Sequence, residues 1–388
     1  MFIAQAFKVR HEFWRYLIGS LIIFVAALIG QFPLLGAVIF KAIEDGTGIG
    51  NISETSMYQM LDPNLFLFLA LLSFAVGFIG LYIAVKALHG QKLTSVATSR
   101  KKLDWKRIWF AFIFWGVISS GLVLIDYFFL SPESYEYNFE MKRFLILAVI
   151  AIVLIPIQTS LEEYIFRGYL MQGFGTATTE KSFPFAFLIS IITIPLFIIL
   201  NIKYSMGYMQ NGLLLVIVIV LGIILFQIIK KTNGLESNSY KKLRALCQRN
   251  WTPLLITSAI FGLLHIANPE IDKLGYSLLI YYIGTGLFLG IMTLMDEGTE
   301  LALGFHAANN LFTALLVTAN WTAFQTHSIL KDVAEPKLEF IDMVLPVFII
   351  FPIILFIFSK VYKWNNWKDK LFGKIHEPPK EDYKIIEE

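Results

Sequence analysis

The stretch FLILAVIAIVLIPIQTSLEEYIFR, residues 144–167, decides the fold. Its first part, residues 144–161, is almost wholly apolar and close to the length of about 20 residues that a helix needs to cross a bilayer. Two carboxylates, Glu162 and Glu163, and the guanidinium of Arg167 follow directly. Whether the stretch is a membrane span depends on the composition of the rest of the chain.

That composition is typical of a membrane protein. Of the 388 residues, 56% are hydrophobic, 35 are Phe and only 16% are charged, and the mean hydropathy is +0.65. Soluble domains carry roughly 25% charged residues, so a soluble globular enzyme, a disordered protein and a nucleic-acid binder are excluded. The single cysteine, Cys247, excludes intramolecular disulfides and a thiolate metal cluster. We therefore predict an integral membrane protein whose surroundings are the lipid bilayer.

Apolar runs of similar length recur along the sequence. Because each crossing needs about 20 residues, the chain holds about ten candidate spans, at residues 13–40, 65–88, 108–130, 144–161, 183–201, 211–229, 253–267, 275–295, 300–320 and 342–361. None alternates strictly between apolar and polar residues, as a membrane β-strand does. The sequence thus predicts an all-α fold, a polytopic transmembrane helical bundle.

The charges of the loops predict its orientation. Basic residues gather in the N-terminal segment, in the loops after the second and sixth spans, and in the tail; they are Lys8, Arg10, Arg15, Lys92, Arg100, Lys101, Lys102, Lys106, Arg107, Lys230, Lys231, Lys241, Lys242, Arg244, Arg249, Lys360, Lys363, Lys368, Lys370 and Lys374. An even number of spans and a cytoplasmic N-terminus place all of them inside, as the positive-inside rule requires. We expect both termini in the cytoplasm, an uncleaved first span and, if the source is a bacterium, the inner (plasma) membrane.

Three short segments bring ionisable groups into the apolar runs, at residues 161–168 (LEEYIFRG), 261–265 (FGLLH) and 306–310 (HAANN). An ionisable side chain at membrane depth is costly, so each is a candidate functional group. On a helix, Glu163 and Arg167 lie one turn apart and can pair, whereas Glu162 points about 100° away from Glu163.

The other two segments place each pair of residues on one helix face, Phe261 with His265 and His306 with Asn310. Taken singly, a Glu–Arg pair is often an interfacial salt bridge, and His or Asn in a span often bonds a neighbouring helix. Their joint occurrence favours one site in the bundle interior. The reaction class stays open at this point between a hydrolase, a transporter or proton relay using the same Glu and His groups, and a catalytically silent scaffold.

The three segments together resemble the CPBP family, the CAAX proteases and bacteriocin-processing enzymes also called Abi proteins. The signature of that family is Glu-Glu-x-x-x-Arg, then Phe-x-x-x-His, then His-x-x-x-Asn, each in a membrane helix. Here they read EEYIFR from Glu162 to Arg167, FGLLH from Phe261 to His265, and HAANN from His306. All three occur complete and in the order of the family.

The resemblance implies an intramembrane endopeptidase that hydrolyses peptide bonds of membrane-associated proteins or peptides. It implies that Glu162 is the general base that activates water and that Glu163 and Arg167 are its supporting pair. It further implies that His265, His306 and Asn310 position the water and stabilise the oxyanion.

A metal ion is an open question for this set of residues. Glu162, His265 and His306 would suit zinc as ligands, and the enzyme would then be a metallo-endopeptidase. The chain has no His-Glu-x-x-His helix, however, which would place two ligands one turn apart around a base. We therefore favour a glutamic endopeptidase without a cofactor.

The resemblance also divides the chain. Four parts are expected: N-terminal spans at 1–141, a protease core at 142–320 with an inserted pair of spans at about 183–250, a loop and last span at 321–362, and a cytoplasmic tail at 363–388. The insertion makes the distance between the first two motifs longer than in many members of the family. Straight spans with the bounds given above would leave Glu162 near the inner face and His265 in the outer half, about 15 Å apart in depth.

Overall fold

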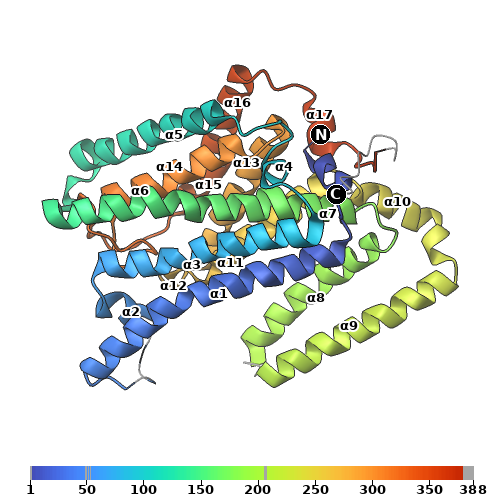
Figure 1. Ribbon diagram of the computed structural model, residues 1–388, viewed down its shortest axis with the longest axis horizontal. Helices are drawn as coiled ribbons and strands as arrows, with labels where there is room; N and C mark the ends of the chain where they lie inside the picture. The colour runs from blue at the N-terminus through green and yellow to red at the C-terminus, as the bar shows by residue number, and fades with distance from the viewer. Residues whose placement is uncertain (1, 49, 51, 53, 205–207, 379–388) are drawn as a thin grey trace.

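The computed structural model describes residues 2–48, 50, 52, 54–204 and 208–378. Helices form nearly all of its regular structure (Figure 1). The first half holds α1 (Phe13–Glu44), α2 (Glu54–Met60), α3 (Pro63–Ile83), α4 (Leu93–Ala97), α5 (Trp105–Ile125), α6 (Met141–Glu163) and α7 (Met171–Ala177). The second half holds α8 (Phe183–Tyr204), α9 (Tyr208–Lys231), α10 (Asn238–Cys247), α11 (Trp251–Leu264), α12 (Pro269–Leu274), α13 (Leu279–Asp296), α14 (Glu300–Leu316), α15 (Phe340–Leu345), α16 (Phe351–Val361) and α17 (Trp367–Phe372). Residues 379–388 of the predicted tail lie outside the described residues.

Many of these helices have the length and composition of membrane spans. Within the described ranges, seven are long and apolar enough: Phe13–Glu44, Pro63–His89, Trp105–Leu130, Met141–Ala177, Gln210–Lys231, Tyr276–Asp296 and Phe340–Val361. Shorter apolar helices lie at Phe183–Thr193 and Trp251–Ala267. The predicted all-α, multi-pass membrane protein is confirmed. The span count and the cytoplasmic position of the termini stay predictions.

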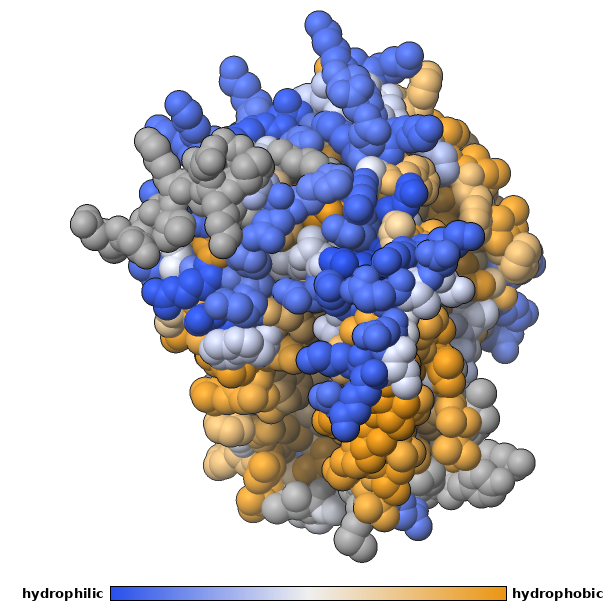
Figure 2. Space-filling view, turned by 90° about the vertical axis from the view of Figure 1, so that its right-hand side faces the viewer, coloured by the Kyte–Doolittle hydropathy of each residue, from blue (hydrophilic) through white to orange (hydrophobic). Residues whose placement is uncertain are grey.

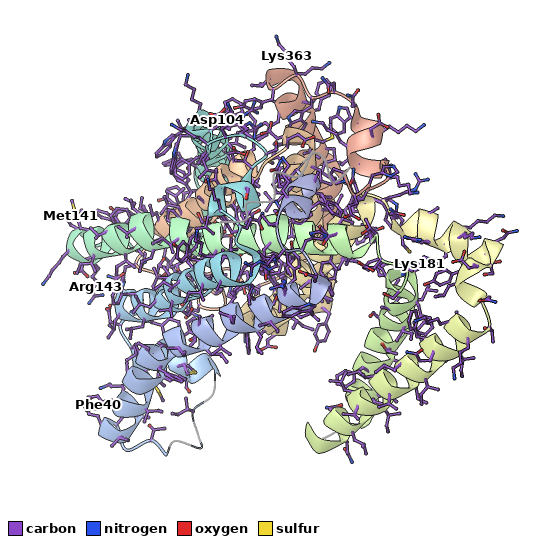
Figure 3. The ribbon with its side chains drawn as sticks, turned by 45° about the vertical axis from the view of Figure 1, so that its right-hand side comes forward. Phe40, Asp104, Met141, Arg143, Lys181 and Lys363 are labelled. Carbon is purple, nitrogen blue, oxygen red and sulfur yellow. The ribbon has the colours of Figure 1, made fainter. Side chains whose placement is uncertain are left out.

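The outside of the bundle is apolar. The side chains of Phe40, Phe129 and Ile192 are 71%, 78% and 66% exposed, and Figure 3 shows Phe40 toward the far end of α1. Seen from the right-hand side of Figure 1, hydrophilic residues cover the upper part of the surface and hydrophobic residues the part below (Figure 2). In water such a surface would drive association, whereas in a bilayer it contacts lipid.

The helix that carries the first motif is longer than the sequence predicts. The candidate span ends at residue 161, but α6 continues through a π-helical stretch, Tyr164–Leu170, into α7 and ends at Ala177. Figure 3 shows Met141 at the start of this long helix and Lys181 just beyond its other end. The π-helical stretch is a widened turn of the kind that often occurs at functional sites.

Close helix contacts hold the elements around this helix. Helix α14 packs against α5 and α6, α3 packs against α1 and α6, and α11 packs against α13. Glycine permits the last of these contacts: a Cβ on Gly286 would lie 2.9 Å from the Cα of Ser258, and one on Gly262 would lie 2.7 Å from the backbone nitrogen of Ile283. Without these glycines α11 and α13 would be forced apart.

Two further features lie outside this packing. Strands β1 (Tyr135–Tyr137), β3 (Leu330–Asp332) and β2 (Val317–Thr318) form a small sheet in that order, with β3 antiparallel to β1 and parallel to β2. The sequence did not predict these strands, because two or three residues are too few to show a period. The inserted helices α8 and α9 form a hairpin that stands away from the bundle in Figures 1 and 3.

Candidate active site

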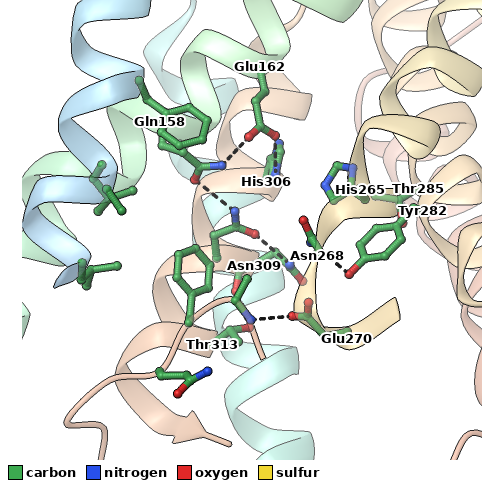
Figure 4. Close-up of a pocket in the computed structure, with 18 of the residues that line it drawn as sticks. Gln158, Glu162, His265, Asn268, Glu270, Tyr282, Thr285, His306, Asn309 and Thr313 are labelled. Carbon is green, nitrogen blue, oxygen red and sulfur yellow. Dashed lines mark hydrogen bonds and ion pairs between the residues drawn. The ribbon is translucent and has the colours of Figure 1, made fainter. Parts of the chain in front are cut away.

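The residues of the three motifs meet at a cavity inside the bundle. The cavity has a volume of about 830 Å³, and Glu162, His265, His306 and Asn310 all line it. Figure 4 shows Glu162 on α6, His265 at the end of α11 and His306 on α14 around this cavity. Long-range packing therefore brings together the four groups that the sequence places far apart.

Glu162 and His265 line one cavity, although straight spans with the predicted bounds would leave them about 15 Å apart in depth. Because α6 continues to Ala177, Glu162 lies well inside the long helix, about 22 Å from that end at 1.5 Å per residue. His265 follows the last residue of α11, about 21 Å from Trp251 by the same rise. Both side chains reach the same cavity.

Glu162 has the most open position of the charged residues in the first motif. Its side chain is 15% exposed, and its Oε2 lies 3.7 Å from Nε2 of His306. Its Oε1 accepts a hydrogen bond of 2.5 Å from Nε2 of Gln158. Within the described part of the chain, Oε2 has no hydrogen-bond partner, so one oxygen of this carboxylate is held and the other faces His306.

Glu163 and Arg167 lie behind His306 and are fully buried. Their side chains, 0% and 1% exposed, form the ion pair that their spacing predicts, with Nη1 of Arg167 3.0 Å from Oε1 of Glu163. The same oxygen lies 2.7 Å from Nδ1 of His306. The guanidinium also lies 4.0 Å above the ring of Phe261, so residues of all three motifs support one another.

Both histidine rings are oriented through Nδ1. In His306, Nδ1 donates to the Glu163 carboxylate; in His265, Nδ1 donates to the backbone oxygen of Phe261 at 2.8 Å. A neutral imidazole carries one proton, so these bonds leave each Nε2 as an acceptor. The ring of His265 is further fixed by stacking on Tyr282, with centroids 4.3 Å apart.

Asn310 forms hydrogen bonds with two other side-chain amides, those of Gln158 and Asn309. Its Nδ2 donates to Oε1 of Gln158 at 3.1 Å, and its own Oδ1 accepts from Nδ2 of Asn309 at 3.2 Å (Figure 4). The sequence reasoning missed both Gln158 and Asn309. Gln158 precedes Glu162 by four residues in an apolar run, and that spacing was a usable signal. Asn309, one residue from Asn310, gave none.

Glu270 is a further carboxylate of the cavity that the sequence reasoning missed. It lies in α12, outside the membrane-spanning segments, and its Oε1 accepts a hydrogen bond of 2.8 Å from the backbone N–H of Ala323. Burial raises the pKa of this carboxyl, and the bond from Ala323 partly offsets that rise. Its position fixes the loop around residue 323 against the cavity.

The zinc alternative concerns Glu162, His265 and His306. Among the described residues, no group of three or more His, Cys, Asp or Glu side chains is placed to hold a metal ion. Glu163 and the Phe261 carbonyl orient His306 and His265, as outer-shell partners of a metal site would.

These observations define a multi-pass membrane protein with an acid, two imidazoles and an amide around an internal cavity. Residues 141–239 and 240–312 match the family model described as Type II CAAX prenyl endopeptidase Rce1-like. This match confirms the resemblance predicted from the three motifs and supports a CAAX-type intramembrane protease. It is also 26% identical over 310 residues to the uncharacterized protein YyaK of Bacillus subtilis (strain 168), over 80% of this chain and 79% of that protein. No solved structure matches the chain.

Proposed function

We propose that the protein is a glutamic endopeptidase that cleaves membrane-associated proteins or peptides inside the bilayer. The observation that carries the proposal is the meeting of Glu162, His306 and His265 at one cavity, with Oε2 of Glu162 3.7 Å from Nε2 of His306. A carboxylate and an imidazole acceptor at that separation suit a water molecule between them. Aromatic residues, among them Phe66, Phe324 and Phe351, line part of the cavity, which suits an apolar substrate segment.

In this mechanism Glu162 takes a proton from the water while the water oxygen bonds to the carbonyl carbon of the substrate. His306 orients the water through its Nε2 acceptor, and His265 lies at the same cavity with its Nδ1 held by the Phe261 carbonyl. Asn310 uses one amide N–H for Gln158 and has a second N–H for the developing oxyanion. The C–N bond then breaks, and the proton held by Glu162 passes to the leaving amine, which restores the carboxylate.

The arrangement behind His306 supports this role. Glu163 accepts from Nδ1 and is itself held by Arg167, so the imidazole keeps one orientation and one tautomer. Because both supporting side chains are buried, the charge of Glu163 acts on His306 without screening by solvent. Fixed dipoles and charges of this kind need no rearrangement during the reaction.

The test is the substitution Glu162→Gln, which keeps the shape of the side chain and the acceptor for Gln158. We expect loss of cleavage with unchanged expression and thermal stability, whereas Glu133→Gln, at an exposed loop position, should cleave like the wild type. Proteomics of newly formed peptide termini in membranes from the three strains would measure this. Full activity of Glu162→Gln would remove Glu162 as the base.

The same membranes distinguish the glutamic from the metal-dependent reaction. We expect wild-type cleavage to persist after prolonged treatment with a zinc chelator. Loss of cleavage on chelation and its recovery on addition of Zn²⁺ alone would overturn the glutamic assignment, while leaving the endopeptidase itself in place.

A further inference from the structure

A chain of side-chain hydrogen bonds reaches Glu162 from a residue outside the cavity. Nε1 of Trp115 in α5 donates to Oδ1 of Asn309 at 3.1 Å, and Nδ2 of Asn309 donates to Oδ1 of Asn310 at 3.2 Å. Nδ2 of Asn310 donates to Oε1 of Gln158 at 3.1 Å. Nε2 of Gln158 then donates to Oε1 of Glu162 at 2.5 Å. The chain joins three helices, α5, α14 and α6.

The chemistry of its first member fixes the direction of every bond in the chain. An indole N–H can only donate, so Asn309 must turn its carbonyl oxygen to Trp115 and its NH₂ group to Asn310. Asn310 must therefore turn its carbonyl oxygen to Asn309 and its NH₂ group to Gln158. Gln158 in turn must direct its carbonyl oxygen to Asn310 and its NH₂ group to Glu162. Reversing any one amide would place two donors or two acceptors face to face. The last donor in the series therefore points at the carboxylate of Glu162.

Trp115 donates its one side-chain hydrogen bond to Asn309. It is not among the residues that line the cavity, so a bound substrate would not touch it. Its ring stacks on Phe305, with centroids 4.5 Å apart and an angle of 27° between the planes. This stacking holds the indole N–H in one direction.

We propose that Trp115 is a positioning residue for the reaction proposed above, on which this inference rests. It orients Asn309, Asn310 and Gln158 so that Gln158 holds one oxygen of Glu162 and leaves the other for water. The same orientation directs the second N–H of Asn310, which serves the oxyanion. Loss of the indole N–H would free all three amides to rotate, and fewer molecules would hold the reactive geometry.

The test is a double-mutant cycle on the purified full-length protein, with a peptide whose cleavage depends on Glu162. Trp115→Phe keeps an aromatic ring against Phe305 but removes the donor. We expect kcat to fall about tenfold, the change that one lost hydrogen bond gives, with little change in KM. Trp109→Phe, in the same helix with a side chain 55% exposed, is the matched control and should behave as wild type.

The decisive comparison combines Trp115→Phe with Gln158→Leu. If Trp115 acts through the chain, its substitution lowers kcat by a smaller factor once Gln158 is gone than it does in the wild type, because coupled positions are not additive. If its role is only structural, the two losses multiply, and the inference is overturned. Asn309→Leu, which cuts the chain at its next link, should reproduce the loss of kcat and serves in place of Trp115→Phe if that variant does not fold.

The two proposals fail in different ways. Cleavage that survives Glu162→Gln would refute the proposed function and this inference together. Cleavage that is abolished by Glu162→Gln but keeps the wild-type kcat in both Trp115→Phe and Asn309→Leu would refute the positioning role alone.

Discussion

At the scale of single residues, the ion pair of Glu163 and Arg167 is the most constrained feature of the site. Both side chains are almost completely buried, and Glu163 is shared between Arg167 and His306. Oε2 of Glu163 and Nη2 of Arg167 have no hydrogen-bond partners among the described residues. Burying charges is costly, so the pair is held by its mutual attraction and by the ring of Phe261 rather than by a complete set of hydrogen bonds.

We therefore predict that Glu163→Gln destabilises the protein by about 3–5 kcal/mol, the usual effect of leaving one buried charge unpaired. Thermal unfolding in detergent would measure it. Glu162→Gln provides the comparison, because Glu162 faces the cavity and should leave the melting temperature unchanged. Replacing both partners, as Glu163→Gln with Arg167→Met, should recover part of the loss; equal melting temperatures for Glu163→Gln and wild type would contradict the prediction.

Residue spacing predicted part of this site and could not predict the rest. The i, i+4 relation of Glu163 and Arg167 is a property of one helix, so it could be predicted from the sequence alone. The bond from Trp115 to Asn309 joins α5 to α14, and it depends on how those helices pack. Nothing in the sequence around Trp115 distinguishes it from the other aromatic residues of an apolar run.

At the scale of elements, the helix Met141–Ala177 extends well beyond the predicted end of the span at residue 161. Hydropathy ends the span at residue 161 because Glu162, Glu163 and Arg167 interrupt the apolar run. In the folded chain Glu163 and Arg167 neutralise each other and Glu162 meets a cavity, so the helix continues without exposing charge to lipid. Hydropathy treats each residue separately, and it therefore cannot detect polar groups that pair.

The contact between α11 and α13 sets the position of His265, which follows α11 directly. A Cβ on Gly286 would lie 2.9 Å from both the Cα and the backbone oxygen of Ser258, so the helices would have to separate. We predict that Gly286→Ala costs about 1–3 kcal/mol of stability and lowers the cleavage rate by displacing His265. Melting temperature and kcat measure the two effects.

Gly121 in α5 provides the control for this substitution. A Cβ there would meet nothing within 4 Å, so Gly121→Ala should leave cleavage unchanged and stabilise the helix by roughly 0.5–1 kcal/mol. If Gly286→Ala and Gly121→Ala gave the same melting temperature and rate, the close approach of α11 and α13 would not be what positions His265.

At the scale of the whole molecule, the two ends of the bundle differ in charge, and this difference predicts the orientation. The span order places the basic loops at one end of the bundle and the loops joined by the small sheet β1–β3–β2 at the other. Composition and loop charge were sufficient to predict a multi-pass helical membrane protein and to propose its orientation. They could not show how the inserted α8–α9 hairpin is placed, because its lipid-facing residues specify no partner helix.

The orientation can be tested with single cysteines, since the chain has only one, Cys247, and it is buried. In a Cys247→Ala background, Glu133→Cys and Glu335→Cys lie in segments predicted outside, and Lys102→Cys and Lys368→Cys in segments predicted inside. All four positions are exposed, so labelling should depend on the side of the membrane alone. We expect a membrane-impermeant maleimide to label the first two in intact cells and the last two only after lysis. The reverse pattern would invert the predicted topology. A helix that spans the bilayer must have its two ends on opposite sides. Labelling of Glu335→Cys and Lys368→Cys on the same side would therefore show that α15 and α16 do not cross the membrane.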